Sequence, residues 1–406
     1  SLAREGYRLP YFKANSLNRY RDQFVQFESS TKYFTKTDLS DFTEGELFVQ
    51  EDLANTLERI ARFGRSGFYN GVTARLISDE MKRNKGLISL QDLRNYQSKW
   101  RDVHTTEFRG WELHMMPLPS SGSVAIHQIL EMIKEHELTE MGHNSAAYIH
   151  LLAEAMKRAF ADRSHYLGDP DFVDVPVAEL TNGAYNQKRM QDFNKEYITP
   201  AYDLSYGDVA TLKESDQTTH FSIIDNEGNA VAVTTTLNGS FGSKLSVDGA
   251  GFLLNNEMDD FSAKPGEPNM FGLIGGEANA IEAGKRMLSS MTPTIVSKNG
   301  EVRMLLGAAG GSRIISTVLQ TFLNLALFDM NAHQAVSAPR FHHQWLPDLL
   351  RYENMGLNPD TRSLLIEKGY DFRPLSIGRS HLIYVDEKGG MQGAPDPRGD
   401  GYAAGY

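Results

Sequence analysis

The sequence predicts an α+β fold in which stacked, mainly antiparallel sheets are covered by helices. Its first half carries apolar residues at helical spacing, which is typical of helices that pack one face against a core. From Thr218 onward, short β-rich runs alternate with turn sequences such as Asn299-Gly300, which suits a type I′ hairpin turn. Three such hairpins, with helices before, between and after them, indicate stacked antiparallel sheets.

The individual elements follow from these patterns in chain order. Helical faces are expected at residues 53–60, 76–81, 126–133 and 148–159, with Gly64 ending the first helix and Asn144 capping the last. The hairpins are expected at 221–237, 294–306 and 381–393. Between the two halves, residues 198–216 are polar and contain Pro200 and Gly207, which is the composition of a linker.

Composition narrows the range of functions. The chain has 406 residues, 40% hydrophobic and 23% charged, which is enough for one or two domains with a buried core. A net charge of −11 provides no basic surface for nucleic acid. The absence of cysteine excludes thiol catalysis and disulfides. The longest apolar stretch, 314–328, is interrupted by polar residues and does not reach the roughly 20 apolar residues of a membrane helix.

Thr218, at the start of the first hairpin, is a candidate nucleophile. A threonine hydroxyl within a chain reacts weakly, but an N-terminal threonine can pass its proton to its own α-amine. A linker that ends at Gln217, directly before a threonine that begins a strand, suits a chain that cleaves itself there. The alternative is that Thr218 and Thr219 simply favour the strand, because they are β-branched.

A glycine-rich loop at residues 307–313 lies between a predicted strand and an apolar helix. Paired glycines at a helix N-terminus allow backbone N–H groups to approach an anion. The Lys-[Ser/Thr] ending of a phosphate-binding P-loop is missing, so a nucleotide is disfavoured. The loop suits the oxyanion of an acyl-transfer intermediate, or it is a tight turn between strand and helix.

Two further segments carry polar groups suited to a small ligand. Residues 253–261 place amides and carboxylates, including Glu257 and Asp260, directly after an apolar strand, where they can hold an ammonium. The alternative is a solvated turn or a helix cap. Ser289 and Ser290 can donate to a carboxylate. The histidines show no spacing of a zinc site, so no metal is expected, and no cofactor is predicted.

The order of these motifs along the chain closely resembles the small subunit of γ-glutamyltransferases. The resemblance extends over essentially the whole chain and includes the end of the large subunit. The matching segments are 119–122, 161–163, 166–170, 218–222, 234–238, 255–261, 288–291, 310–313, 338–344 and 404–406. This family consists of N-terminal-nucleophile hydrolases with an αββα sandwich.

The resemblance implies a role for each matching residue. Thr218 would be the nucleophile and the first residue of the small subunit (218–406), after cleavage from residues 1–217; the two pieces would pair as a heterodimer within one sandwich. Thr236 would support the Thr218 hydroxyl. The α-ammonium of the glutamyl group would be bound by Asn238, Glu257 and Asp260. Its α-carboxylate would be bound by Ser289 and Ser290, and the amides of Gly310 and Gly311 would stabilise the oxyanion.

The chain departs from the family pattern at two points. The family's large subunit begins with a segment that has no counterpart here, and that segment supplies an arginine for the α-carboxylate. We therefore expect residues 1–406 alone to be poorly soluble or weakly active. The second departure is Phe271, in the lid-like stretch 265–276, where some bacterial members carry a tyrosine that donates a hydrogen bond.

The resemblance also implies substrates, partners and location. Glutathione and other γ-glutamyl compounds would be acyl donors, and water, an amino acid or a dipeptide would be the acceptor. The protein would be periplasmic or extracellular, with no nucleic-acid partner and no membrane segment in this chain. The alternatives are a related acylase of the cephalosporin or polyglutamate-processing type, which the paired carboxylates disfavour, and an inactive fragment.

Overall fold

The computed structural model describes residues 1–204, 218–354 and 356–405. The chain divides into two compact units, one of residues 1–100 and 239–256 and the other of residues 101–238 and 257–406. We call them unit 1 and unit 2. The division predicted at Thr218 follows a cleavage site rather than compactness, and it stays a prediction.

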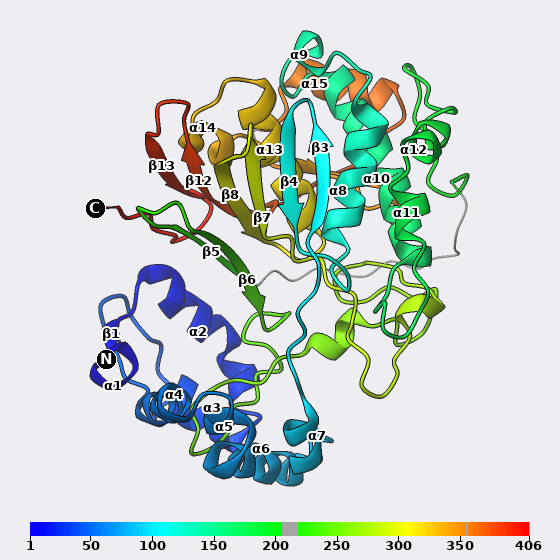
Figure 1. Cartoon of the computed structure of the whole chain (residues 1–406). Helices are drawn as coiled ribbons and strands as arrows, with labels where there is room; N and C mark the ends of the chain where they lie inside the picture. Colours follow the sequence, from blue (N-terminus) through cyan, green and yellow to red (C-terminus); the bar gives the residue numbers. More distant parts are fainter. Residues whose placement is uncertain (205–217, 355, 406) are drawn as a thin grey trace. The chain divides into compact units, whose positions relative to one another are not determined.

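Unit 1 consists mainly of short helices with one small antiparallel sheet (Figure 1). The segment 239–256 belongs to this unit because it completes two of its apolar clusters. The ring centroids of Phe241 and Phe24 lie 5.1 Å apart, and Val247 packs with Ile77. The elements are α1 (Leu2–Glu5), β1 (Tyr7–Arg8), α2 (Tyr11–Phe24), α3 (Glu28–Phe34), β2 (Leu47–Phe48), α4 (Glu51–Phe63), α5 (Ser66–Tyr69), α6 (Gly71–Arg83) and α7 (Leu90–Asn95).

Unit 2 contains the sheets. The larger one has six antiparallel strands in the order β13-β12-β8-β7-β4-β3, and β5 and β6 form a separate antiparallel pair. A third, three-stranded sheet has the order β11-β10-β9. The strands are β3 (His104–Phe108), β4 (Trp111–Met115), β5 (Thr218–Ile224), β6 (Ala230–Thr236), β7 (Thr294–Lys298), β8 (Glu301–Ala309), β9 (Phe341–His342), β10 (Leu350–Tyr352), β11 (Phe372–Pro374), β12 (Arg379–Val385) and β13 (Met391–Pro395).

Helices of unit 2 cover one face of the six-stranded sheet, and α13 and α10 supply much of the buried core. The helices are α8 (Gly122–Ile133), α9 (Leu138–Met141), α10 (Ala146–Tyr166), α11 (Val177–Leu180), α12 (Gly183–Arg189), α13 (Arg313–Leu327), α14 (Ala332–Ser337) and α15 (Pro359–Glu367). Two 3₁₀ turns lie at Glu257–Asp260 and Glu277–Asn279.

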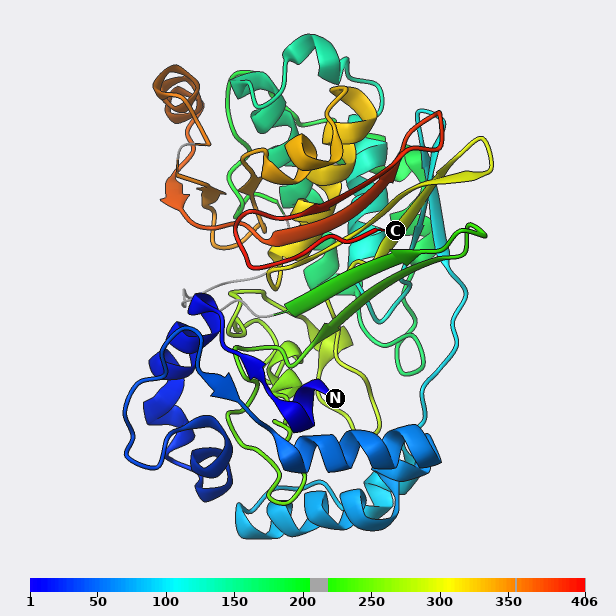
Figure 2. The same cartoon turned by 90° about the vertical axis from the view of Figure 1, so that its left-hand side faces the viewer.

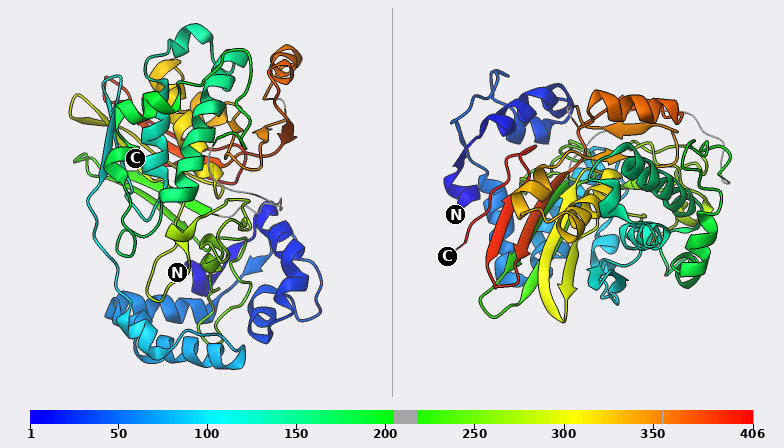
Figure 3. Two further views of the ribbon diagram at one scale, coloured as in Figure 1. Left: turned by 90° about the vertical axis from the view of Figure 1, so that its right-hand side faces the viewer. Right: turned by 90° about the horizontal axis from the view of Figure 1, so that it is seen from above.

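The hairpin β5–β6 packs on the six-stranded sheet, against β8 and β12. Figure 2 shows this hairpin in green beside the red strands β12 and β13, and Figure 3 shows the same strands from above. The sheets are therefore stacked, with helices on the far side of the larger one. This arrangement confirms the predicted α+β class of stacked antiparallel sheets covered by helices.

The three predicted hairpins are all present as β5–β6, β7–β8 and β12–β13. Asn299 and Gly300 both have positive φ, 56° and 79°, as a type I′ turn requires.

One detail of the helices was predicted wrongly. Ser145, not Asn144, caps α10, because its side chain accepts from the Tyr148 N–H. Asn144 has φ of 53° and donates to the carbonyl of Pro339 instead.

No helix among the described residues has the length and apolar character needed to span a membrane.

Candidate active site

Thr218 begins β5 and lies directly opposite Thr236 of β6. Because side chains alternate along a strand, the hydroxyls of both residues belong to the face of the hairpin that also carries His220. The Thr218 hydroxyl donates to the Thr236 hydroxyl across 3.3 Å, and the same Thr236 oxygen accepts the backbone N–H of Asn238 at 2.8 Å. These contacts give the Thr218 hydroxyl a defined direction at the first residue of β5.

His220 holds the hairpin against β8 and is unsuited to be a base. Its ring covers Gly307, where an added Cβ would come within 2.2 Å of Nδ1. Nδ1 shares a hydrogen bond with Thr234 Oγ1 at 2.9 Å, and Nε2 shares one with Ser222 Oγ at 3.0 Å. Burial and the neighbouring His381 lower the pKa of His220 to about 3. The imidazole is therefore neutral near pH 7 and serves as a packing group.

Gly310 and Gly311 join the end of β8 to the start of α13. Their φ angles are 144° and 56°, which side chains rarely adopt. A Cβ on Gly310 would lie 2.9 Å from Gly378 Cα, and one on Gly311 would lie 2.6 Å from the ring of Phe271. Both conformation and space thus require glycine. The turn brings these two backbone amides to the N-terminus of a 15-residue helix, which favours negative charge.

Gln344 connects this glycine turn to the loop that carries Phe271. Its Oε1 accepts from the Ser312 hydroxyl at 2.9 Å, and its Nε2 donates to the carbonyls of Phe271 and Gly272 at 3.2 and 2.9 Å. His342 Nε2 also contacts Gln344 Oε1 at 3.0 Å. One buried amide therefore sets the position of the phenyl ring over the glycine turn.

Ser289 and Ser290 are held by the turn that precedes α8. Ser289 donates its backbone N–H to Pro119 O at 2.8 Å, and its carbonyl accepts the Ser121 N–H at 2.8 Å and the Ser121 hydroxyl at 2.7 Å. Gly122 then packs on Thr292 so closely that a Cβ would lie 1.9 Å from Thr292 Oγ1. The 119–122 segment, although distant in sequence, thus holds the serine pair in place through direct contacts.

The acidic pair Glu257 and Asp260 belongs to one 3₁₀ turn. Burial, and then the charge of Glu257, raise the pKa of Asp260 to about 8, and burial raises the pKa of Glu257 to about 7. The Arg163 guanidinium opposes this rise at Asp260. Two carboxyls that ionise with such difficulty are suited to a cationic ligand, whose charge would favour their ionised forms.

The structure brings most of the predicted site residues into one small pocket. Its free volume is about 20 Å³, close to the space of a single water molecule. Gly310 adjoins this pocket through Gly311, and Glu257 interacts electrostatically with the lining residue Asp260. Gln217 falls outside the described residues. The lining includes Thr218, Thr236, Asn238, Asp260, Phe271, Ser289, Ser290 and Gly311.

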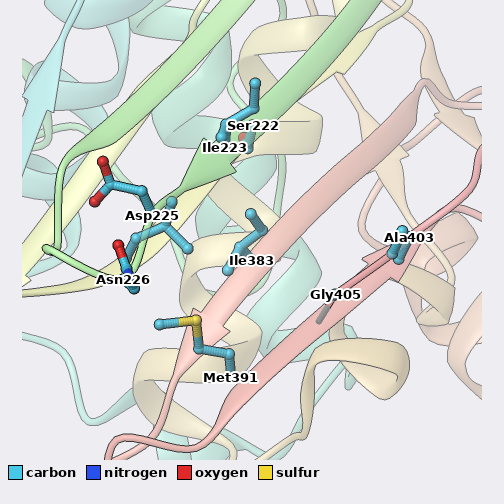
Figure 4. Close-up of a pocket in the computed structure, with 11 residues that line it drawn as sticks. Ser222, Ile223, Asp225, Asn226, Ile383, Met391, Ala403 and Gly405 are labelled. Carbon is cyan, nitrogen blue, oxygen red and sulfur yellow. The ribbon is translucent and has the colours of Figure 1, made fainter.

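A larger hollow of about 740 Å³ lies beside the far end of the same hairpin (Figure 4). Ile223, Ile383 and Met391 give it an apolar lining, and Asp225 at its edge is engaged by the backbone N–H groups of its own turn. Ser222 also lines it, but its histidine partner has the depressed pKa described above. None of the predicted site residues borders this hollow.

Three residues of the pocket's surroundings escaped the sequence analysis. Arg163 and Ser121 support the serine pair, and Gln344 links Phe271 to the glycine turn. All three residues lie within the segments that resemble the family, which was the available signal. Nothing in their spacing indicates partners more than 70 residues away, such as Ser289, Ser290 and Phe271.

The sequence profile of the family described as gamma-glutamyltranspeptidase matches residues 1–406. The glutathione hydrolase proenzyme of Escherichia coli (strain K12) is 44% identical over 407 residues, which cover 100% of this chain and 70% of that protein. The glutathione hydrolase proenzyme of Pseudomonas aeruginosa is 46% identical over 391 residues, 93% of this chain and 69% of that protein.

A solved structure is similar over the whole chain. The crystal structure of cephalosporin acylase from Bacillus halodurans superposes with a TM-score of 0.86, covering 100% of this chain and 72% of that one. The two sequences are 23% identical, so this likeness shows the fold alone. It agrees with the stacked sheets described above.

The raised pKa values make the acidic pair a source of instability at alkaline pH. A carboxyl whose folded-state pKa lies above its unfolded value of about 4 stabilises the fold below that pH and loses this contribution as pH rises through the folded value. We therefore expect Asp260→Asn to raise the melting temperature at about pH 9 and to change it little at about pH 4. Calorimetry checks this, with exposed Glu282→Gln as the control. A lower melting temperature at alkaline pH would contradict the assigned burial.

Proposed function

Because the chain belongs to the γ-glutamyltranspeptidase family, we propose that it moves the γ-glutamyl group of glutathione and related amides to water or to an amino acid or dipeptide. The Escherichia coli and Pseudomonas aeruginosa relatives are named glutathione hydrolases, and the chain is accordingly a hydrolase or transferase. The observation that carries the proposal is the single pocket in which Thr218, the glycine turn, Asp260 and the serine pair meet.

The proposed activation begins with cleavage of the bond between Gln217 and Thr218. The Thr218 hydroxyl attacks the carbonyl of the residue before it; as the ester forms, the peptide C–N bond breaks and the α-amine of Thr218 is freed. Water then hydrolyses the ester, which releases the carboxylate of Gln217 and restores the Thr218 hydroxyl. The fragments 1–217 and 218–406 then stay together as a heterodimer. The position of Thr218 at the first residue of β5 supports this step, because the strand fixes one side of the bond.

In the proposed catalytic cycle the free α-amine of Thr218 accepts the hydroxyl proton as Oγ1 attacks the γ-carbonyl of the donor. The Thr236 hydroxyl, 3.3 Å away, keeps Oγ1 directed at the pocket. Negative charge that develops on the carbonyl oxygen is stabilised by the amides of Gly310 and Gly311. The amine leaves, a γ-glutamyl-threonine ester remains, and water or an acceptor amine releases the glutamyl group.

Donor recognition is proposed to use two sets of polar groups in the pocket. Asn238, Glu257 and Asp260 hold the α-ammonium, and Ser289 and Ser290 donate to the α-carboxylate. Phe271, which lies against Gly311, shields the reacting centre from water. Because the free volume is near that of one water, Phe271 or its loop has to move before a donor enters.

A related acylase is the second candidate, because a Pseudomonas relative named acylase ACY 1 proenzyme is 35% identical to this chain over 360 residues. The buried Glu257 and Asp260 argue against it, because an acyl group without an α-amine offers nothing to offset their charge. No cofactor is needed for this chemistry. We assign the protein to the periplasm or the exterior of the cell, as its family resemblance implies.

The cleavage step predicts the fate of Thr218→Ala. The full-length protein should give a fragment that begins at Thr218, whereas Thr218→Ala should stay uncut and inactive because it has no hydroxyl to attack. Intact mass and Edman sequencing check both statements. Thr219→Ala, one residue along the strand, is the matched control and should still be cleaved. A new N-terminus at any other residue would sink the assignment.

The ammonium site predicts a selective effect of Asp260→Asn. A charge-assisted hydrogen bond is worth ~1.5–3 kcal/mol, so kcat/KM for γ-glutamyl-p-nitroanilide should fall about 10- to 150-fold, while self-cleavage continues. Glutaryl-p-nitroanilide, which has no α-amine, should be a poor substrate before the mutation and be little affected by it. If the unmutated enzyme preferred the glutaryl donor, the acylase alternative would replace this proposal.

A further inference from the structure

Arg163, near the end of α10, is a buried cation next to Ser290, one of the two serines proposed to bind the α-carboxylate of the donor. Only 4% of its surface is exposed. Its Nε donates to Ser121 Oγ at 2.9 Å, and its Nη2 donates to Ser290 Oγ at 3.3 Å. Over the part of the chain that the structure describes, Arg163 forms no ion pair with a carboxylate within 4.0 Å.

The other buried arginine of α10 shows what is unusual about this one. Arg158 pairs with Glu154 at 2.7 Å and with Asp192 at 2.7 Å. A buried charge normally needs such partners, because transfer from water costs several kcal/mol or more. Asp260 is the carboxyl that interacts electrostatically with Arg163, and burial lowers the pKa of Arg163 to about 10. A bound anionic group would therefore be stabilised by the positive charge of Arg163.

The hydrogen bonds decide where the hydroxyl protons point. A guanidinium donates and never accepts, so each serine oxygen that it contacts receives a hydrogen bond and keeps its own proton for another acceptor. Ser121 uses its proton on the carbonyl of Ser289. Ser290, which lines the pocket, has its oxygen engaged from behind by Arg163 and can direct its proton into the pocket.

We propose that Arg163 is a positioning residue for the α-carboxylate of the donor: it orients the Ser290 hydroxyl toward that carboxylate and supplies the positive charge behind it. This inference rests on the γ-glutamyl transfer proposed above. It adds a cation to the proposed carboxylate site from within the chain, in addition to the arginine that the family resemblance assigns to an upstream segment. Arg163 thereby contributes to the choice of donors that carry an α-carboxylate.

Three p-nitroanilide donors separate this role from a structural one. γ-Glutamyl-p-nitroanilide has both the amine and the carboxylate, glutaryl-p-nitroanilide has only the carboxylate, and 4-aminobutyryl-p-nitroanilide has only the amine. In the full-length processed enzyme, Arg163→Met should lower kcat/KM about 10- to 100-fold for the two carboxylate donors, the size of one lost charge-assisted interaction. For 4-aminobutyryl-p-nitroanilide the change should stay below about threefold.

The comparison uses the pH-independent plateau of each kcat/KM profile, because Arg163 also lowers the pKa of Asp260. Arg163→Lys keeps the charge and should recover part of the loss for the carboxylate donors only. Arg158→Met, which removes the other buried arginine of α10, is the matched control and should affect all three donors alike.

Two results would overturn the inference: equal losses for all three donors in Arg163→Met, or full activity toward the carboxylate donors. If Arg163→Met does not fold, Arg163→Lys decides alone, since its loss should be confined to the same two donors. If the unmutated enzyme does not turn over γ-glutamyl-p-nitroanilide at all, the proposed function fails instead, which keeps the two failures distinct.

Discussion

The packing of the hairpin β5–β6 on strand β8 is the constraint on which the candidate site depends. His220 covers Gly307 at the centre of this contact, and any side chain at Gly307 would collide with the ring. The register within the hairpin places Thr218 opposite Thr236, and strand β8 ends at the glycine turn. One sheet-to-sheet contact therefore sets the distance between the proposed nucleophile and the amides proposed to stabilise the oxyanion.

The rest of the pocket is assembled by hydrogen bonds over long sequence distances. The turn before α8 positions the serine pair, Gln344 joins the Phe271 loop to the glycine turn, and Arg163 stands behind Ser290. The electrostatics are unfavourable while the pocket is empty, since buried carboxyls resist ionisation and a buried guanidinium lacks an ion-pair partner among the described residues. A donor whose α-carbon carries both an ammonium and a carboxylate would offset both costs. The groups that lower the stability of the free enzyme would then be the same groups that select donors with an α-amino acid group.

Local patterns were enough to predict the three hairpins and the helices α4, α6, α8, α10 and α13. The Asn-Gly turn between β7 and β8 and the apolar stripe of α10 each depend on residues close in sequence, which is why they could be inferred. The cap of α10 was wrong because Asn144 has a distant partner, the carbonyl of Pro339, that sequence spacing does not reveal. The same limit explains why Arg163 and Gln344 were missed. Their partners lie more than 70 residues away, at Ser290 and Phe271.

The central claim is that Thr218 carries the acyl group, and trapping that intermediate tests it most directly. The processed enzyme would be mixed with excess γ-glutamyl-p-nitroanilide, quenched in acid within the first turnovers, digested and analysed by mass spectrometry. The account predicts that the peptide beginning at Thr218 gains the mass of one glutamyl group, and that fragmentation places it on that residue. A glutamyl group on any other residue, or turnover with no labelled enzyme at any quench time, would contradict the account.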